Sequence, residues 1–155
     1  MSRRDQIKLT DDEQRELLES ERVVTVASLG QNGWPHLMPL WYVLRDGEIW
    51  VYTYAKSQKV RNLERDPRAT LLVETGHEYA ELRGVMIEAD AYVNREHDLV
   101  FEVAKQLTLR YADGLDSIEG DAAEALASQA RKRVAIRFVG RRTATWDHRK
   151  LGGSY

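Results

Sequence analysis

The chain has 155 residues, of which 23 are lysine or arginine and 25 are aspartate or glutamate, so its formal net charge is −2. This length suits one domain, because single hydrophobic cores cluster near ~100–150 residues. The near-neutral charge excludes the strongly basic surface on which nucleic-acid binding depends. The absence of cysteine excludes disulfides and thiolate metal sites. We therefore interpret residues 1–155 as one globular domain that binds no nucleic acid.

The sequence shows no sorting or membrane signal. Residues 1–12 are polar, whereas a secretory signal needs an apolar stretch behind a basic start. No later segment approaches the ~18 apolar residues of a membrane-spanning helix. The sequence therefore predicts a cytoplasmic protein without membrane contact.

The first predicted elements are a helix and three strands. Thr10 and Glu13 have the spacing of a capping box, which predicts a helix over 11–21. The β-branched run at 23–27 predicts a strand, and glycines with an asparagine at 30–33 predict the turn after it. The dipeptide Asp46-Gly47 is typical of a type I′ turn. It predicts a hairpin between strands over 35–45 and 48–54.

The middle of the chain predicts a short helix and two further strands. Ser57 can cap a helix that ends near Arg65, because the residue before Pro67 is pushed out of the α region. A strand over 69–74 follows. Over 80–94 the alternation of apolar residues slips by one around Gly84, which predicts a long, bent strand with a β-bulge there.

The last predicted elements are two helices and a strand. Apolar residues show helical spacing over 96–111, and an alanine-rich segment over 121–132 predicts a second helix. The final strand is predicted to end near Trp146. Six antiparallel strands with a few helices favour an α+β fold built on a small barrel.

No group of side chains indicates catalysis by the chain alone. The four histidines lie far apart in the sequence and lack the spacing of metal ligands. Neither a dinucleotide-binding glycine motif nor a P-loop is present. The sequence therefore predicts no metal site and assigns no catalytic residue, so any chemistry would come from a bound cofactor.

The strongest candidate site is the segment 56–59, where a predicted strand gives way to a helix. Free backbone amides and the positive end of the helix dipole point outward there, and Lys56 and Lys59 stand three residues apart on one face. This arrangement can bind an anion. It is equally consistent with a capped surface helix whose lysines are solvated.

The strand over 35–45 is unusual because it contains Pro39 within an apolar run. Proline cannot donate to a strand ladder, so it belongs on an edge or at a bulge, where neighbouring amides can meet a ligand. Trp41, Tyr52 and Tyr54 could pack against a flat ring system. An aromatic stripe on paired strands more often belongs to the core or to a subunit interface.

The order of these parts resembles a known family. The residues that carry the resemblance are Pro-Leu-Trp-Tyr at 39–42, Tyr-Thr-Tyr at 52–54 and, most specifically, Lys-x-x-Asn-Leu-x-x-Asp-Pro-Arg at 59–68. They resemble the pyridoxamine 5′-phosphate oxidase-like split β-barrel superfamily. Within it the sequence is most similar to the flavin- and deazaflavin (F-420)-dependent oxidoreductases of the B group.

The resemblance implies an oxidoreductase that acts as a homodimer, with the cofactor in a groove between protomers. The cofactor would be the deazaflavin coenzyme F-420 or, alternatively, FMN, and it would exchange a hydride with a small, planar, unsaturated substrate. Lys59 and Ser57 would bind its phosphate with help from Lys56. The other expected cofactor-binding residues are Asn62 at the turn, Met38, Pro39 and Trp41 along the ring, Tyr52 and Thr53 beside the ribityl chain, and Trp146 from the partner.

Two features leave the activity open. The strand over 35–45 lacks the Arg-x-x-x-x-Lys pair of the vitamin oxidases, so oxidation of pyridoxamine phosphate itself is not expected. The chain could also bind a flavin or haem without turnover, or serve only as a dimerisation scaffold. In the scaffold case no cofactor would co-purify with it.

Overall fold

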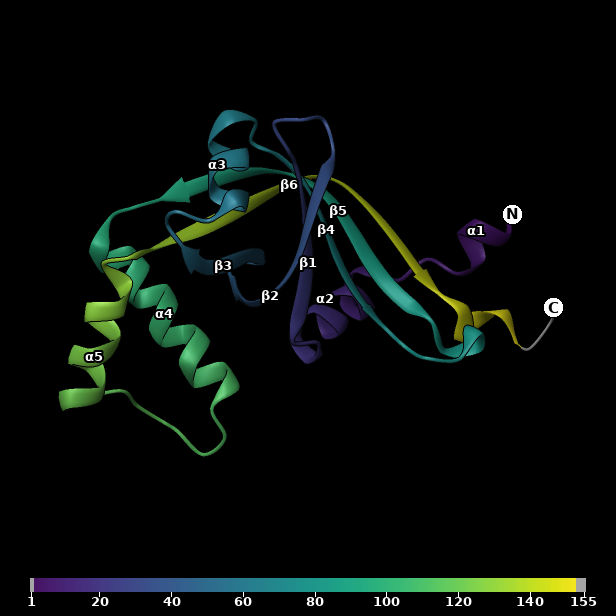
Figure 1. The fold of residues 1–155 in the computed structure, drawn as a ribbon. Helices are drawn as coiled ribbons and strands as arrows, with labels where there is room; N and C mark the ends of the chain where they lie inside the picture. Colours follow the sequence, from purple (N-terminus) through teal and green to yellow (C-terminus); the bar gives the residue numbers. More distant parts are fainter. Residues whose placement is uncertain (1, 153–155) are drawn as a thin grey trace.

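The computed structural model describes residues 2–152. Six antiparallel strands form a closed barrel in the order β1-β2-β3-β6-β5-β4 (Figure 1), which confirms the predicted α+β split barrel. The strands are β1 (Val23–Leu29), β2 (Pro35–Arg45), β3 (Glu48–Tyr54), β4 (Arg68–Thr75), β5 (Arg83–Asn94) and β6 (Arg133–Asp147). The helices are α1 (Arg3–Gln6), α2 (Asp11–Ser20), α3 (Gln58–Arg65), α4 (His97–Tyr111) and α5 (Gly120–Ala130), with 3₁₀ helices η1 (Tyr79–Glu81) and η2 (His148–Leu151).

The core fills the inside of the barrel. Strand alternation turns every second residue inward, and Val24, Val51 and Val85 are completely buried there. Leu17 of α2 and Val60 of α3 belong to the same cluster, so both helices pack onto the barrel core. Each fully buried aliphatic side chain contributes roughly 1.5–3 kcal/mol. Hydrophobic burial therefore holds the helix that carries the candidate site.

Strands β2 and β3 separate part of the way along the barrel. Their ladder runs from Arg45–Glu48 to Tyr42–Val51 and does not continue within the described residues. From Pro35 to Trp41, β2 pairs only with β1. This part of β2 therefore has one edge without a strand partner. The unpaired edge is the one on the side of β3 and of the helix α3 that follows β3.

A second apolar cluster lies outside the barrel. Val43 and Trp50 of the β2–β3 hairpin pack against Val100, Val103 and Leu107 of α4. Figure 1 shows α4 and α5 together on one side of the molecule, away from both termini. The helices therefore add a wall to the outer face of the hairpin.

Most of the predicted helices and strands are confirmed, and the predicted position of the β-bulge is wrong. Thr10 and Glu13 form the capping box of α2, and the hairpin turn has φ of 52° at Asp46 and 78° at Gly47, as a type I′ turn requires. The β-bulge does not lie at Gly84. The register of β5 and β6 shifts between Glu88 and Ala89 instead.

Gly84 has a different role. A Cβ atom at this position would overlap the ring of Trp146, which lies across it on β6. Gly84, which suggested a bulge, therefore leaves the space that an aromatic ring fills. The slip in the apolar pattern did not reveal this, because it depends on a partner 62 residues away in the chain.

Candidate functional site

The turn from β3 into α3 orients the first site residues. The Ser57 backbone amide donates to the Tyr54 carbonyl oxygen at 3.1 Å, and extended dihedral angles at Ser57 make it the N-cap residue of α3. Its side chain does not make the expected capping hydrogen bond. Its Oγ atom is instead buried, with no hydrogen-bond partner among the described residues. An unpartnered buried hydroxyl costs about 1–3 kcal/mol, so Ser57 carries hydrogen-bonding capacity that the chain itself leaves unused.

Lys59 is buried without a counter-ion. Its side chain lies in the first turn of α3, only 8% of the residue is exposed, and Nζ donates to Thr53 Oγ1 at 3.0 Å. No carboxylate in residues 2–152 pairs with it. Burial lowers the pKa of Lys59 below its ordinary value, because the charged form has lost water. An anion placed beside Nζ would compensate this charge.

Asn62 ties α3 to the end of β1. It is fully buried, and its Nδ2 donates to Ser28 Oγ at 3.1 Å. Its Oδ1 accepts from Gln58 Nε2 at 2.9 Å. Both the Nδ2 and the Oδ1 atom of Asn62 therefore form hydrogen bonds within the protein. These bonds fix the position of α3.

Two further cations lie within three residues of Lys59 in the sequence. Lys56 in the turn and Arg61 on α3 are exposed, and neither forms an ion pair within the described part of the chain. The predicted common face for Lys56 and Lys59 is not seen, because Lys56 is exposed and Lys59 is buried. We name Thr53, Lys56, Ser57 and Lys59 the α3 corner. Two lysines and two hydroxyls make it suited to a phosphate.

The predicted ring-binding residues lie along the unpaired edge of β2. Met38, Pro39 and Trp41 all fall in the part of β2 that pairs only with β1. Trp41 is 59% exposed, and one face of its ring stacks on Tyr111 with centroids 4.5 Å apart. Pro39 has no backbone N–H to donate to a ladder, and it lies in a strand with one free edge, as expected for proline.

Tyr52 and Thr53 point to opposite faces of β3. Successive strand residues alternate in direction, and Thr53 is buried toward Lys59 whereas Tyr52 lines a cavity against α4. The placement of both side chains beside one ribityl chain, which the resemblance implies, stays a prediction. Thr53 belongs to the α3 corner, and Tyr52 belongs with Trp41 on the outer face of the hairpin.

Trp146 lies far from the α3 corner within one protomer. It is next to the last residue of β6, and Figure 1 shows this end of β6 near the C-terminus, across the molecule from α3. Its ring packs over Gly84 of β5. One chain therefore does not bring Trp146 to Lys59, and only a second protomer could do so.

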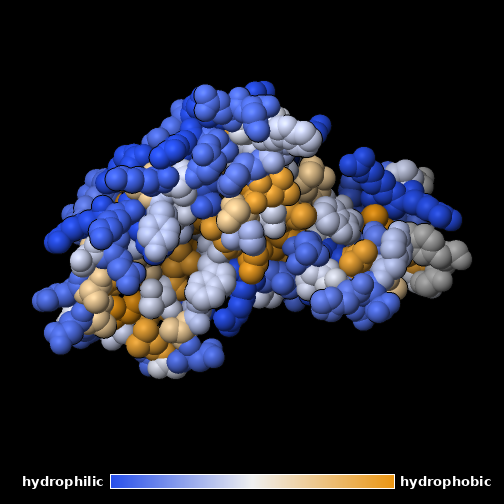
Figure 2. All heavy atoms as spheres, in the orientation of Figure 1, coloured by the Kyte–Doolittle hydropathy of each residue, from blue (hydrophilic) through white to orange (hydrophobic). Residues whose placement is uncertain are grey.

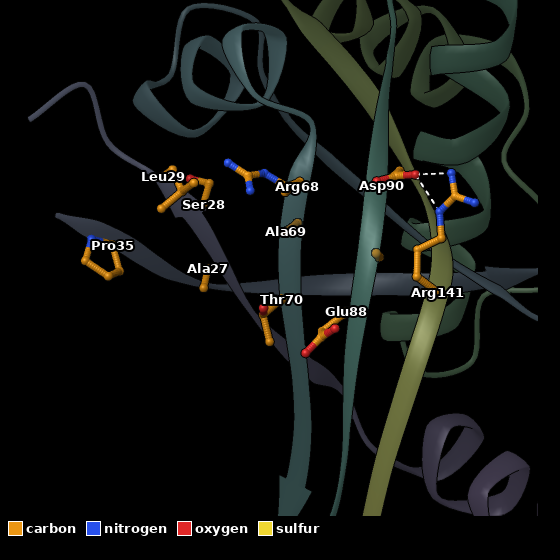
Figure 3. A pocket seen from close by; sticks show the side chains of 11 residues that line it. Ala27, Ser28, Leu29, Pro35, Arg68, Ala69, Thr70, Glu88, Asp90 and Arg141 are labelled. Atoms are coloured by element: carbon orange, nitrogen blue, oxygen red, sulfur yellow. Dashed lines mark hydrogen bonds and ion pairs between the residues drawn. The ribbon is translucent and has the colours of Figure 1, made fainter. Parts of the chain in front are cut away.

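The cavity drawn in Figure 3, about 510 Å³, opens over the strands β1, β4, β5 and β6. Small side chains such as Ala27, Ala69 and Ala89 form part of its lining. Its cations are already neutralised, because Arg141 pairs with Asp90 and Arg68 pairs with Asp66. It therefore offers less attraction to an anion than the α3 corner does.

A cavity of about 570 Å³ lies beside α3, between Gln58 and the β1–β2 turn. Trp34 at this turn is 74% exposed, and His36 Nδ1 is buried without a hydrogen-bond partner among the described residues. Neither this cavity nor that of Figure 3 is lined by Lys59 or Ser57. These two side chains therefore lie outside both cavities.

The outer face of β1 and β2 is apolar. In the register of these strands Val23 pairs with Trp41, Ala27 with Leu37 and Leu29 with Pro35, so their side chains share one face. Exposed fractions reach 58% for Leu37 and 44% for Val23. Figure 2 shows apolar side chains gathered over the middle of the molecule, where Figure 1 labels β1 and β2. Such a patch is typical of a protein–protein interface.

Sequence reasoning missed the residues that build the walls around these sites. Ser28 was overlooked, although a serine at an inward position of an apolar strand signals a buried hydrogen-bond partner. Arg133 and Tyr111 gave no signal, because their roles depend on how α4 packs on the hairpin.

Within residues 2–152, no group of three or more His, Asp or Glu side chains is arranged to hold a metal ion. No helix in this range could cross a membrane.

Comparisons with known proteins identify the family. No functionally curated protein matches the sequence. The crystal structure of the conserved hypothetical protein Rv2991 from Mycobacterium tuberculosis is 40% identical, with a TM-score of 0.87 over 100% of this chain and 95% of that chain. An F420 reductase is 18% identical with a TM-score of 0.62, covering 83% of this chain and 94% of that chain.

HutZ, the heme storage protein from Vibrio cholerae, is 16% identical with a TM-score of 0.67, covering 88% of this chain and 96% of that chain. At these identities HutZ and the F420 reductase show a shared fold alone. The family model for pyridoxamine 5′-phosphate oxidase matches residues 10–147, which include the whole barrel and the α3 corner. The chain therefore belongs to the pyridoxamine 5′-phosphate oxidase family of split β-barrel proteins.

Proposed function

We propose that this protein is an oxidoreductase that holds the deazaflavin coenzyme F-420, or alternatively FMN, by its phosphate at the α3 corner. The observation that carries the proposal is the buried Lys59 ammonium, which has a hydroxyl partner but no carboxylate. The unpartnered Ser57 Oγ beside it supplies a second group for an anion. The family match supports a cofactor of the flavin type.

In this proposal the chain's residues bind and orient the cofactor. Lys59 and Ser57 contact the phosphate, Lys56 adds a second positive charge, and Asn62 keeps α3 against β1. The unpaired edge of β2 at Met38, Pro39 and Trp41 meets the polar rim of the ring system. When bound, the cofactor supplies hydride transfer to or from a small, planar, unsaturated substrate.

A second protomer completes the groove. Neither of the two cavities near β1 is lined by Lys59 or Ser57, and the apolar outer face of β1 and β2 gives a partner a surface to cover. We place Trp146 of the partner subunit over the cofactor. The proposed assembly is a cytoplasmic homodimer.

A second candidate function is binding without turnover. The α3 corner consists of lysines and hydroxyl groups, with neither a carboxylate nor an imidazole that could move protons. A flavin- or haem-sequestering protein needs no such group, so this composition suits storage as well as catalysis. The two functions differ in their reaction with electron acceptors.

Titration of the purified protein with F-420 and with FMN tests the proposal, with fluorescence and thermal unfolding as readouts. A ligand at 100 times its dissociation constant adds about 2.7 kcal/mol of stability. The oxidoreductase proposal predicts saturable binding and consumption of the reduced cofactor by a planar unsaturated acceptor. Binding without reaction with any acceptor favours sequestration. No binding of either cofactor contradicts the oxidoreductase and the flavin-sequestering function, and a parallel titration with haem tests haem sequestration.

A further inference from the structure

A separate cavity lies between the β2–β3 hairpin and the helices α4 and α5. Its volume is about 320 Å³, at the lower end of the roughly 300–1,000 Å³ found for ligand pockets. Trp41, Leu107 and Leu126 give it largely apolar walls. The size and lining suit a flat molecule of one or two fused rings.

Arg133, at the start of β6, puts a positive charge in the wall of this cavity. Its guanidinium carbon lies 3.9 Å from the ring centroid of Tyr54 and 4.9 Å from that of Tyr52. It forms no ion pair or hydrogen bond through its side chain within residues 2–152. Both distances are within the ~6 Å of a cation–π contact, so the two rings hold the guanidinium group without using its N–H groups as hydrogen-bond donors. These free donors match the two oxygens of a carboxylate.

The rest of the lining strengthens the preference for an anion. No aspartate or glutamate lines the cavity. The Tyr52 hydroxyl oxygen is buried without a hydrogen-bond partner in the described chain, and burial raises the pKa of Tyr52, so the phenol stays protonated and able to donate. An oxygen of a ligand beside it would supply the missing partner.

We propose that this cavity is a binding site for a small planar carboxylate, whose rings lie against Trp41 and whose carboxylate pairs with Arg133. The site shares Trp41 with the β2 edge proposed for the cofactor ring, but it is distinct from the α3 corner, because Tyr52 and Thr53 lie on opposite faces of β3. The inference therefore stands whether or not the protein binds a flavin. If both sites are occupied together, the carboxylate is a substrate or effector held next to the cofactor.

The first test compares 2-naphthoate with the neutral 2-naphthamide on the cofactor-free wild-type protein, by calorimetry and by quenching of tryptophan fluorescence. The two probes share their ring system and differ in charge. We expect naphthoate to bind about ten-fold or more tightly than the amide, because an ionised partner strengthens its hydrogen bonds. Equal binding of both probes, or no binding of naphthoate, overturns the proposal.

Variants then locate the site. Arg133→Gln is expected to remove the preference for naphthoate, and Leu126→Trp, which fills the cavity from a half-buried position, is expected to abolish binding of both probes. Arg131→Gln is the matched control, because Arg131 is exposed and does not line the cavity. Naphthoate affinity that follows Arg131 rather than Arg133 contradicts the assignment. The naphthoate–naphthamide comparison on the wild type remains decisive if a variant fails to fold.

A competition experiment separates this site from the cofactor site. Naphthoate is titrated into protein saturated with FMN, and FMN into protein saturated with naphthoate. Binding of both, with each affinity changed less than about three-fold, supports two sites. Mutual exclusion would place naphthoate where the flavin ring binds and would overturn the separate site, while leaving the proposed cofactor function intact.

Discussion

Lys59 is a positively charged side chain that is buried without a counter-ion in the described structure. The side chain is buried against Thr53, and no carboxylate pairs with it in the described structure. A buried unpaired charge destabilises a folded protein, and replacing a buried ionic group by an apolar side chain of similar volume is often neutral or stabilising. The residue that we expect to bind the phosphate is thus a cost to the cofactor-free protein.

The first prediction follows from this cost. Lys59→Met should leave the free energy of unfolding of the cofactor-free protein unchanged or raise it by up to about 2 kcal/mol. Urea unfolding measures this, with Lys105→Met on α4 as the control, because Lys105 is bound to Glu102 on the surface. A loss of stability of more than about 1 kcal/mol in Lys59→Met would show that the lysine is a structural residue.

The second prediction concerns pH. Burial lowers the pKa of Lys59 below the ordinary 10.5, and a phosphate binds the protonated form. The affinity for FMN should therefore be constant while Lys59 is protonated and fall as the pH rises through its lowered pKa. Fluorescence titrations from about pH 7 upward check this. Lys59→Met should show weak binding with no such fall, and a wild-type affinity that is flat up to 10.5 would contradict the role of Lys59.

At the scale of elements, Arg110 joins three parts of the fold. Its guanidinium group donates to the Leu18, Glu19 and Glu21 carbonyl oxygens at the end of α2, at 2.8 to 3.1 Å. It also donates to the Tyr42 carbonyl oxygen of β2 at 2.7 Å. One side chain of α4 therefore anchors this helix to the barrel at the point where β2 and β3 separate.

The third prediction tests this anchor. Arg110→Met should lower the free energy of unfolding by about 2–4 kcal/mol, because several carbonyl groups lose a charged donor at once. Arg131→Met, which changes an exposed arginine after α5, should alter it by less than about 0.5 kcal/mol. Chemical unfolding of both variants measures the difference. Equal effects would mean that the Arg110 hydrogen bonds exchange freely with water.

Sequence patterns predicted the elements well, because each pattern depends on neighbours in the chain. The bounds of β2 and β3 and the Asp46-Gly47 turn follow from alternation and turn chemistry. Contacts between distant segments were not visible in the same way. The seat of Trp146 on Gly84, the hydrogen bond from Asn62 to Ser28 and the stacking of Arg133 on Tyr52 all join residues more than 30 positions apart. The α3 corner was proposed from its local segment, but the division between the two faces of β3 required the fold.

At the scale of the whole molecule, the proposed cofactor groove needs two protomers. Figure 1 shows the Trp146 end of β6 and the helix α3 on different sides of one chain. The exposed apolar face of β1 and β2 offers a surface that self-association would bury. Association and cofactor binding should therefore be linked.

The fourth prediction addresses this linkage. Sedimentation should show a dimer for the wild type. Leu37→Glu, which puts a charge on the outer face of β2 where 58% of the residue is exposed, should weaken dimerisation by at least about 100-fold without unfolding the monomer. The same variant should lose FMN affinity. A monomeric variant that binds FMN as tightly as the wild type would contradict a groove shared between protomers.

The most direct measurement of the central claim is the affinity of wild-type protein and of Lys59→Met for FMN and for riboflavin, which lacks the phosphate. If the phosphate rests against Lys59, the wild type should prefer FMN by about ten-fold or more, because a charge-assisted contact is worth roughly 1–3 kcal/mol. Lys59→Met should lose most of this preference and keep only the part that Ser57 and Lys56 supply. An undiminished preference for FMN in Lys59→Met would place the phosphate elsewhere and contradict the account.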